Sequence, residues 1–533
     1  MTGNLSSLVS RAFRGAGQVA GVAAEAVSLG TDAVTTGAGA SVRATTCAAR
    51  VLRDAVVHGA KGTEAVWRHG QKLHVGLRPE STGDASRFGR VVRKLVREAM
   101  ARPDVLAAYW DAGLSRMVLT MAEGAASDRL VAAVTARARK HGLSVGSPDE
   151  ASAHPGDLGA VQTQAAALAI SGAGLAMATA ATPLRLRRPP QVLSAALTAV
   201  REHPLAQDFL RARLGRPGAE LAVATANAAL HGIGKSPADL ALDVLLRAGQ
   251  LADAVAQVVA FERSCDRLCV PDRDCPTARP ERRPAPPDPV TDYAKTALTG
   301  GLVGAGATVL FKRDLSQASS AILASSPKPA RYGWTAYASG TGLALAREGV
   351  LVRNPDRLRL LQAADTLVVH SNALCGDQRT VLEAHPTDTE WAEGRLWQAA
   401  LHAVDGEDSS VRLRPAPDDP DAETGLMIAS ADGVDVGTVL VGWVPDPLAE
   451  SVLDAAGQAG LRIVVVQGSS PGADAALADE VVTDRAMADV VTGCQEDGHV
   501  VLTLARVPPS ADASARDGAL DGLLRGDLAV AVA

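Results

Sequence analysis

The chain has 533 residues, 47% of them hydrophobic and 3% aromatic, and a formal net charge of −6. This length is typical of several domains, and the apolar content is sufficient for packed cores. The mild charge excludes the basic footprint of nucleic-acid-binding proteins, so we expect no nucleic-acid partner. Three of the six cysteines lie between residues 265 and 275. No second pair follows them, so we expect no zinc site there.

The first 70 residues alternate Ala, Val and Gly stretches with sparse charges, which predicts an Ala-rich helical N-terminal segment. It could be a loosely helical surface segment or a helix at a membrane surface. Charged residues from Arg11 to Asp32 interrupt the apolar positions, so we expect no secretory signal.

Residues 71–146 have the pattern of a ferredoxin-like domain, with strand, helix, two strands and helix in order. The expected elements are a strand at Leu73–Arg78, a helix at Ser86–Met100, two strands within Val105–Met121 and a helix at Ala126–His141. The loop Pro79–Ala85 contains neither Cys nor His. Because soft metals need thiolate or imidazole ligands, we expect this domain to bind no metal.

Residues 147–275 predict a helical region. Leu158–Leu184 contains no charged residue and is followed by arginines, which suits a transmembrane helix. A buried helical pair is the alternative. Gln191–Ala260 predicts amphipathic helices, with breaks at Pro204, Gly215–Gly218 and Gly232–Pro237.

Residues 276–292 are rich in Pro and Arg and predict a linker. Residues 293–349 predict a helical hairpin with candidate membrane segments, because Thr296–Phe311 and Leu315–Pro327 contain no charged residue. Gly301–Gly306 lies in the first of these segments. It is more typical of small-residue helix packing than of a dinucleotide site, since no strand clearly precedes it.

Residues 350–533 alternate strands and helices, which predicts a Rossmann-like sheet with a short insert at 376–444. The first strand, Ala364–Val369, ends at His370, and chemistry in such sheets lies beyond the carboxyl ends of the strands. The other expected elements are strands at Leu461–Val466, His499–Leu504 and 526–532, and helices at Ala449–Ala459 and Arg485–Gln495.

A family resemblance lies in the segment Leu360–Gly376. Its leucine pair, Asp365-Thr366, hydrophobic strand and following loop resemble the phosphorylation segment of P-type cation-transporting ATPases. The chain most resembles the degenerate N-terminal half of the actinobacterial cation-transporting ATPase I type. The resemblance implies an α/β plus α chain. It would contain a degenerate heavy-metal-associated domain, a membrane-associated helical region and a haloacid-dehalogenase-like phosphorylation domain.

The residues that carry the family's chemistry are replaced. His370 stands at the place of the phosphorylated Asp, Ser469 ends the strand that reads Thr-Gly-Asp in the family, and Arg506 and Ser510 occupy the Gly-Asp-Gly-Val-Asn-Asp segment. The family would use Mg²⁺ and ATP, and an aspartyl phosphate needs a carboxylate nucleophile. We therefore expect these positions to be degenerate, with no catalytic, cofactor-binding or metal-binding residue.

These expectations favour a catalytically inactive, membrane-associated half that serves a regulatory or structural role. The resemblance implies the plasma membrane, with the membrane and an active P-type ATPase half as partners. Two alternatives stay open: an active cation transporter that forms part of a longer or split protein, and a soluble haloacid-dehalogenase-like binding protein. Because the family's sheet and later membrane helices continue beyond Ala533, we expect a truncated or split product.

Overall fold

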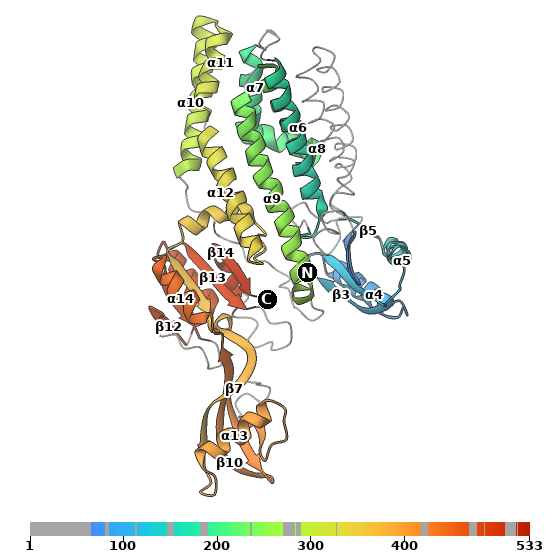
Figure 1. Cartoon of the computed structure of the whole chain (residues 1–533), viewed down its shortest axis with the longest axis vertical. Helices are drawn as coiled ribbons and strands as arrows, with labels where there is room; N and C mark the ends of the chain where they lie inside the picture. Colours follow the sequence, from blue (N-terminus) through green and yellow to red (C-terminus); the bar gives the residue numbers. More distant parts are fainter. Residues whose placement is uncertain are drawn as a thin grey trace. The chain divides into compact units, whose positions relative to one another are not determined.

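A computed structural model of the chain divides into two units (Figure 1). The first comprises Met1–Pro271 and Pro287–Pro355, and the second comprises Asp272–Pro286 and Asp356–Ala533. The N-terminal segment expected before residue 66 lies outside the described residues. The structure describes residues 66–79, 85–111, 114–146, 154–181, 190–234, 237–269, 283, 289–326, 328–416, 425–467, 477–483, 485–506, 519 and 521–532.

The first unit begins with an antiparallel sheet in the order β1-β2-β4-β3, with β5 also paired to β2. Leu73, Val75 and Leu77 alternate along β2 and are buried in one core with the apolar faces of α4 and α5. The order β2-α4-β3-β4-α5 is the predicted one, and β5 is additional. The elements are β1 (Val66–His69), β2 (Lys72–Pro79), α4 (Ala85–Met100), β3 (Val105–Asp111), β4 (Arg116–Met121), α5 (Ser127–Lys140) and β5 (Leu143–Val145).

Strand β1 is a correction to the sequence analysis, which assigned its residues to the N-terminal segment ending at residue 70. Val66 pairs with Val75, and Gly70 turns the hairpin with a φ of 55°. Trp67 is buried. A strand of four residues is too short for its alternation to be recognised, and its stability comes from the pairing with β2.

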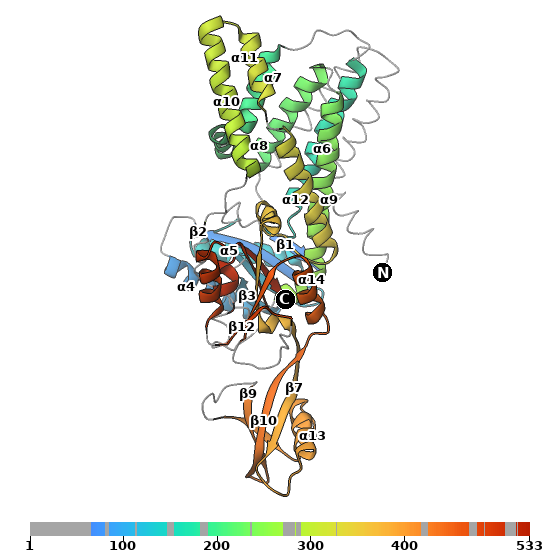
Figure 2. The same cartoon turned by 90° about the vertical axis from the view of Figure 1, so that its left-hand side faces the viewer.

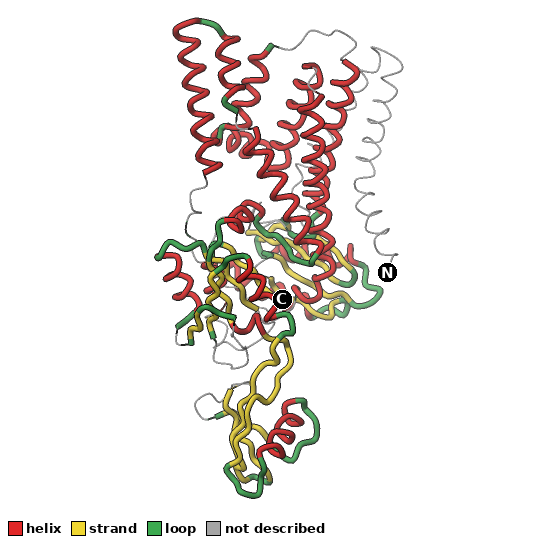
Figure 3. The backbone as a smooth tube through the Cα atoms, turned by 60° about the vertical axis from the view of Figure 1, so that its left-hand side comes forward, coloured by secondary structure: helices red, strands yellow, loops and turns green. Residues whose placement is uncertain are grey.

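Long helices follow in the first unit and lie side by side (Figure 3). Gly215 in α8 has a non-helical backbone, with φ 69° and ψ 168°, so the break expected at Gly215–Gly218 is observed. The breaks expected near Pro204 and before Pro237 are also observed. The helices are α6 (Leu158–Ala181), α7 (Gln191–Glu202), α8 (Pro204–Gly234), α9 (Pro237–Leu268), α10 (Pro289–Lys312), α11 (Leu315–Ala324) and α12 (Lys328–Arg347).

Two helices of the described part are long and apolar enough to cross a membrane, by length and composition alone: α9 and residues 292–312 of α10. Helix α6, which covers most of the predicted Leu158–Leu184 segment, is not one of them. Ala166, Ala167 and Ile170 of α6 are buried in one cluster with Leu221, Ala224 and Ala228 of α8. Part of the apolar surface of α6 therefore packs against α8, and the transmembrane span at Leu158–Leu184 stays a prediction.

The Gly301–Gly306 segment lies within α10, next to α11. A Cβ atom at Gly301 would overlap the side chain of Ser325, whereas one at Gly300 would meet nothing within 4 Å. This close approach agrees with small-residue helix packing, the interpretation favoured over a dinucleotide site.

The second unit contains a parallel sheet in the order β12-β11-β6-β13-β14. Its middle strand β6 is covered on both faces: Val368 packs with α15, and Leu367 and Val369 pack with α14. The predicted strands and helices are present, and β12 is additional. The elements are η2 (Pro355–Gln362), β6 (Thr366–His370), η3 (Ser371–Leu374), α14 (Ala449–Gln458), β11 (Arg462–Val466), β12 (Glu480–Val482), α15 (Met487–Glu496), β13 (Val501–Arg506) and β14 (Leu528–Val532).

The insert between β6 and β11 forms its own antiparallel sheet, in the order β7-β10-β9-β8, with α13 packed against it (Figure 2). Leu396 and Ala400 of α13 are buried against Val439 of β10. The sequence analysis assigned no elements to this insert. They are β7 (Cys375–Pro386), α13 (Glu393–Val404), β8 (Arg412–Pro415), β9 (Gly425–Ala431) and β10 (Val434–Pro445).

The expected linker at 276–292 contributes an anchor to the second unit. Arg283 donates to both carboxylate oxygens of Asp527, at 2.8 and 2.7 Å, and to the carbonyl of Gln495 at 2.9 Å. Asp527 is 1% exposed and also accepts the Val501 N–H at 3.0 Å. Helix α10 begins at Pro289, so residues 289–292 are helical and the expected linker ends earlier than predicted.

Candidate functional site

The carboxyl edge of the parallel sheet presents His370 at the end of β6, the central strand. The Asn372 N–H donates to His370 Nδ1 at 3.3 Å, which places the proton of the neutral ring on Nε2. Burial lowers the pKa of His370, and its bond to Asn372 acts in the opposite direction. The ring is therefore neutral at pH 7, with one nitrogen protonated and the lone pair of the other engaged.

Asn372 joins the ends of two neighbouring strands. Its side chain donates to the Arg506 carbonyl at 3.0 Å and accepts the Arg506 N–H at 3.0 Å. The same edge holds the buried thiol of Cys375. Burial raises the pKa of this thiol, the Arg506 charge opposes that shift, and the Asp446 carboxylate adds to it. The loop after β6 is thus tied to the end of β13 through backbone groups.

The strand ends offer little to a magnesium phosphate complex. Among the described residues, those that end or directly follow β6, β11 and β13 are His370, Ser371, Val466, Gln467 and Arg506, and none is a carboxylate. A Mg²⁺ ion 4 Å from the Arg506 charge would meet a repulsion of about 8 kcal/mol at an effective dielectric of 20. Ser469 and Ser510, the other expected degenerate positions, lie outside the described residues.

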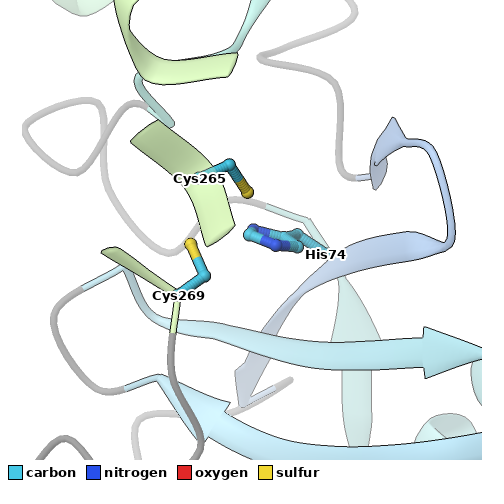
Figure 4. Close-up of side chains that lie close together, drawn as sticks. All are labelled: His74, Cys265 and Cys269. Carbon is cyan, nitrogen blue, oxygen red and sulfur yellow. The ribbon is translucent and has the colours of Figure 1, made fainter. Parts of the chain in front are cut away.

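A cluster of side chains that could coordinate a metal ion lies in the first unit, between β2 and the end of α9 (Figure 4). The ligand atoms of His74, Cys265 and Cys269 all lie within 4.8 Å of one another, and all three residues are buried. Lys72 donates to the carbonyls of Cys265 and Cys269 at 3.4 Å each. Its ammonium also pairs with Asp266 at 2.9 Å.

Aromatic rings enclose His74. The Trp67 ring centroid lies 4.6 Å from that of His74 and 5.3 Å from that of Phe261. Burial lowers the pKa of His74 to about 3, and the charges of Arg116 and Lys72 act in the same direction. The imidazole is therefore neutral at physiological pH, which is the form that coordinates metals.

This cluster is not predicted from the sequence. The cysteines between residues 265 and 275 have no second cysteine pair further along the chain, and the predicted helical pattern ends at residue 260. Cys265 lies in the last turn of α9, and Cys269 follows α9 directly. A spacing of four residues on a helix was the available signal, because it places both thiols on one face. Nothing in the sequence indicates His74, which lies on a strand nearly 200 residues earlier.

Comparison with known proteins places the chain near cation-transporting ATPases. It is 28% identical over 471 residues to the probable cation-transporting ATPase I of Mycobacterium tuberculosis (strain CDC 1551 / Oshkosh), and the match covers 75% of this chain. It is 27% identical over 470 residues to the protein of the same name from Mycobacterium leprae (strain TN). The chain spans 28% of the length of these curated relatives. No family model matches it.

Solved structures with partial likeness have related names. A zinc-transporting PIB-type ATPase has a TM-score of 0.32 and 13% identity, covering 52% of this chain and 53% of that chain. The catalytic domain in a structure of the CPx-ATPase CopB-B has a TM-score of 0.24 and 14% identity, covering 36% of this chain and 86% of that chain. The resemblance to P-type cation-transporting ATPases that the sequence predicted is confirmed, since the mycobacterial homologues are named probable cation-transporting ATPase I.

Proposed function

We propose that this chain is a catalytically inactive, membrane-associated half of a P-type cation-translocating ATPase system, with a regulatory or structural role. The observation that carries the proposal is the internal use of the sheet's carboxyl edge. His370 accepts from Asn372, and Asn372 clamps the backbone of Arg506. The groups at the family's phosphorylation position thus hold the fold together.

Phosphoryl transfer by the histidine itself would need a nitrogen lone pair at the sheet edge. The lone pair on Nδ1 faces the Asn372 N–H, and Nε2 carries the proton. A nucleophile of this kind normally has an adjacent base or a nearby cation-bound phosphate to activate it. The positive charge of Arg506 would oppose the Mg²⁺ that brings such a phosphate.

The test is phosphorylation of the full chain in isolated membranes with Mg²⁺ and γ-labelled ATP. Samples are quenched in acid, which preserves acyl phosphates, and in alkali, which preserves phosphohistidine. We expect no label under either condition, with His370→Ala as the matched variant. Label that disappears in His370→Ala would contradict the proposal and favour the alternative, an active transporter that forms part of a longer or split protein.

Membrane association is proposed from the mycobacterial homologues and the two apolar helices α9 and α10. Washing membranes with alkaline carbonate separates integral from peripheral proteins. We expect the chain to stay in the pellet. Its complete release would favour the soluble haloacid-dehalogenase-like binding protein instead.

The proposed partner is an active P-type ATPase half, and the proposed localisation is the plasma membrane. Co-expression of the chain with such a half allows the partner's ATPase rate to be compared with and without it. A regulatory role predicts a changed rate, whereas a structural role predicts a changed amount of assembled partner. If neither quantity changes, the proposed partnership is wrong.

A further inference from the structure

We propose that His74, Cys265 and Cys269 form a binding site for a thiophilic divalent metal ion of the Zn²⁺ class. The ligand atoms lie within 4.8 Å of one another, close enough for one ion to contact all three (Figure 4). The residues are 0%, 1% and 4% exposed, so the site is enclosed by protein. Two sulfurs and one imidazole are a donor set that zinc accepts and that Mg²⁺ and Ca²⁺ do not.

The hydrogen-bond network around His74 leaves one nitrogen for the ion. Nδ1 of His74 is 3.0 Å from Nε2 of His154. Nε2 of His74 is buried and has no hydrogen-bond partner among the described residues. Buried polar atoms of folded proteins almost always have a partner, so an orphaned nitrogen beside two buried thiols points to a missing ligand.

His154 supplies the contact that a metal-bound histidine normally makes with its second nitrogen. In the metal-free chain the Gly156 N–H donates to Nδ1 of His154, so the His154 proton lies on Nε2 and is donated to Nδ1 of His74. Metal binding at Nε2 of His74 reverses this bond. The His74 proton moves to Nδ1 and is donated to His154, whose own proton moves to Nδ1 as the bond from Gly156 is given up.

Charge balance also favours a divalent ion. Two cysteine thiols lose their protons to solvent on binding, and the two thiolates neutralise the ion in a site that water does not reach. The Lys72 ammonium, held against the carbonyls of Cys265 and Cys269, adds a positive charge that stabilises thiolates. The balanced step is the exchange of one Zn²⁺ for two protons.

The site would fasten the β2 sheet to the end of α9, since its ligands come from both. This inference departs from the expectation that the cysteines between residues 265 and 275 hold no zinc, because His74 supplies a ligand from another part of the chain. It is compatible with the expectation that residues 71–146 bind no metal by themselves, because both sulfurs lie outside that range. It does not rest on the inactivity proposed for the second unit, since it involves no residue of that unit.

The test is titration of the full, reduced and metal-stripped chain with Co²⁺, a spectroscopic substitute for Zn²⁺. We expect one equivalent to bind with a thiolate-to-cobalt charge-transfer band, and Zn²⁺ to displace it. Cys265→Ser and Cys269→Ser should each weaken binding at least ~100-fold, more than loss of a supporting residue typically does. The matched control is Cys494→Ser, which removes a buried free cysteine of the second unit and should change nothing.

A second measurement avoids any variant that fails to fold. Zn²⁺ added to the unmodified chain should protect Cys265 and Cys269 from alkylation, as mapped by mass spectrometry, and should leave the labelling of Cys375 and Cys494 unchanged. Co²⁺ bound without a charge-transfer band, or equal labelling with and without Zn²⁺, would overturn the proposal. So would a disulfide between Cys265 and Cys269 that persists in the reduced preparation.

Discussion

The two candidate sites differ in whether their polar side-chain atoms have hydrogen-bond partners within the protein. One is the carboxyl edge of the parallel sheet, and the other is the His74–Cys265–Cys269 cluster. At the sheet edge, His370 and Asn372 are joined to backbone groups, although the family's chemistry would lie there. In the cluster, the Nε2 atom of His74 is left without a partner among the described residues, where the sequence indicated no site. The place of a residue in a family motif is therefore a weaker guide to its chemical role than whether its polar atoms already have hydrogen-bond partners.

The second unit shows the same contrast between the two edges of one sheet. Its amino edge retains carboxylates: the buried Asp527 pairs with Arg283 at 2.7 Å, and the exposed Asp365 lies 3.2 Å from Nδ1 of His499. The described strand ends at the carboxyl edge have none. Carboxylates that stabilise the sheet are thus present at its amino edge, and the proposed loss of metal ligands at the other edge would leave this support intact.

The largest expected effect comes from breaking the amino-edge anchor. Arg283→Ala leaves the carboxylate of Asp527, which is 1% exposed, without its cation. We expect a loss of about 3 kcal/mol, the low end for a broken buried pair because Arg283 is partly exposed. Hydrogen exchange of β13 and β14 in the full chain measures it.

A matched pair of variants makes this test specific. Arg525 and Asp521 also form an Arg–Asp pair in the second unit, but both side chains are about 40% exposed. Arg525→Ala should cost no more than about 0.5 kcal/mol. Equal effects of the two substitutions would show that the amino edge is not anchored by a buried charge.

The next effect concerns the packing around the His74–Cys265–Cys269 cluster. A Cβ atom at Gly156 would overlap the Trp67 ring and would lie 3.0 Å from Phe261. Gly156→Ala should therefore destabilise the first unit by about 2 to 3 kcal/mol through overpacking. Gly172→Ala in α6, where nothing lies within 4 Å, is the control and should be neutral or slightly stabilising. Thermal unfolding that is unchanged in Gly156→Ala would mean that the aromatic shell is loose.

A smaller effect is expected at the carboxyl edge. Asn372→Ala removes both bonds to the Arg506 backbone, and we expect a loss of about 1 to 2 kcal/mol. Asn372→Asp retains the acceptor for the Arg506 N–H and should lose less. Exchange rates at the end of β13 report the difference. If Asn372→Ala leaves these rates unchanged, the edge is not held by this clamp.

The sequence predicts the parallel sheet better than it predicts the His74–Cys265–Cys269 cluster. The strands are indicated by neighbouring residues, whereas the cluster joins residues that are far apart in the sequence. Val464–Val466 and Leu367–Val369 are apolar runs that indicate strands by themselves, and buried parallel strands need little else. The insert was not predicted because β7 contains many polar residues, and β7 and β10 depend on pairing with each other. The cluster was missed because His74 meets the cysteines only after β2 and the end of α9 have come together.

The last variant, His370→Asp, is expected to have no effect on phosphorylation. It tests directly whether the residue at the family's phosphorylation position decides the chemistry. His370→Asp restores a carboxylate at the place of the family's phosphorylated residue. If one residue decided the chemistry, this variant would form an acid-stable phosphoenzyme from labelled ATP and Mg²⁺. We expect no label, because the Arg506 charge still repels the ion by about 8 kcal/mol at a separation of 4 Å and a dielectric of 20.

The triple variant His370→Asp, Arg506→Asp, Ser510→Asp removes that repulsion and adds carboxylate oxygens. Comparing it with His370→Asp separates the loss of the nucleophile from the loss of metal binding. Label on the triple variant alone would mean that metal binding is the limiting loss. Label on His370→Asp alone would contradict the role given to Arg506. If neither variant is labelled while both keep the exchange protection of β6 and β13, the nucleotide site itself is lost. The insert that contains β7 to β10 would then be the next region to examine for the loss of nucleotide binding.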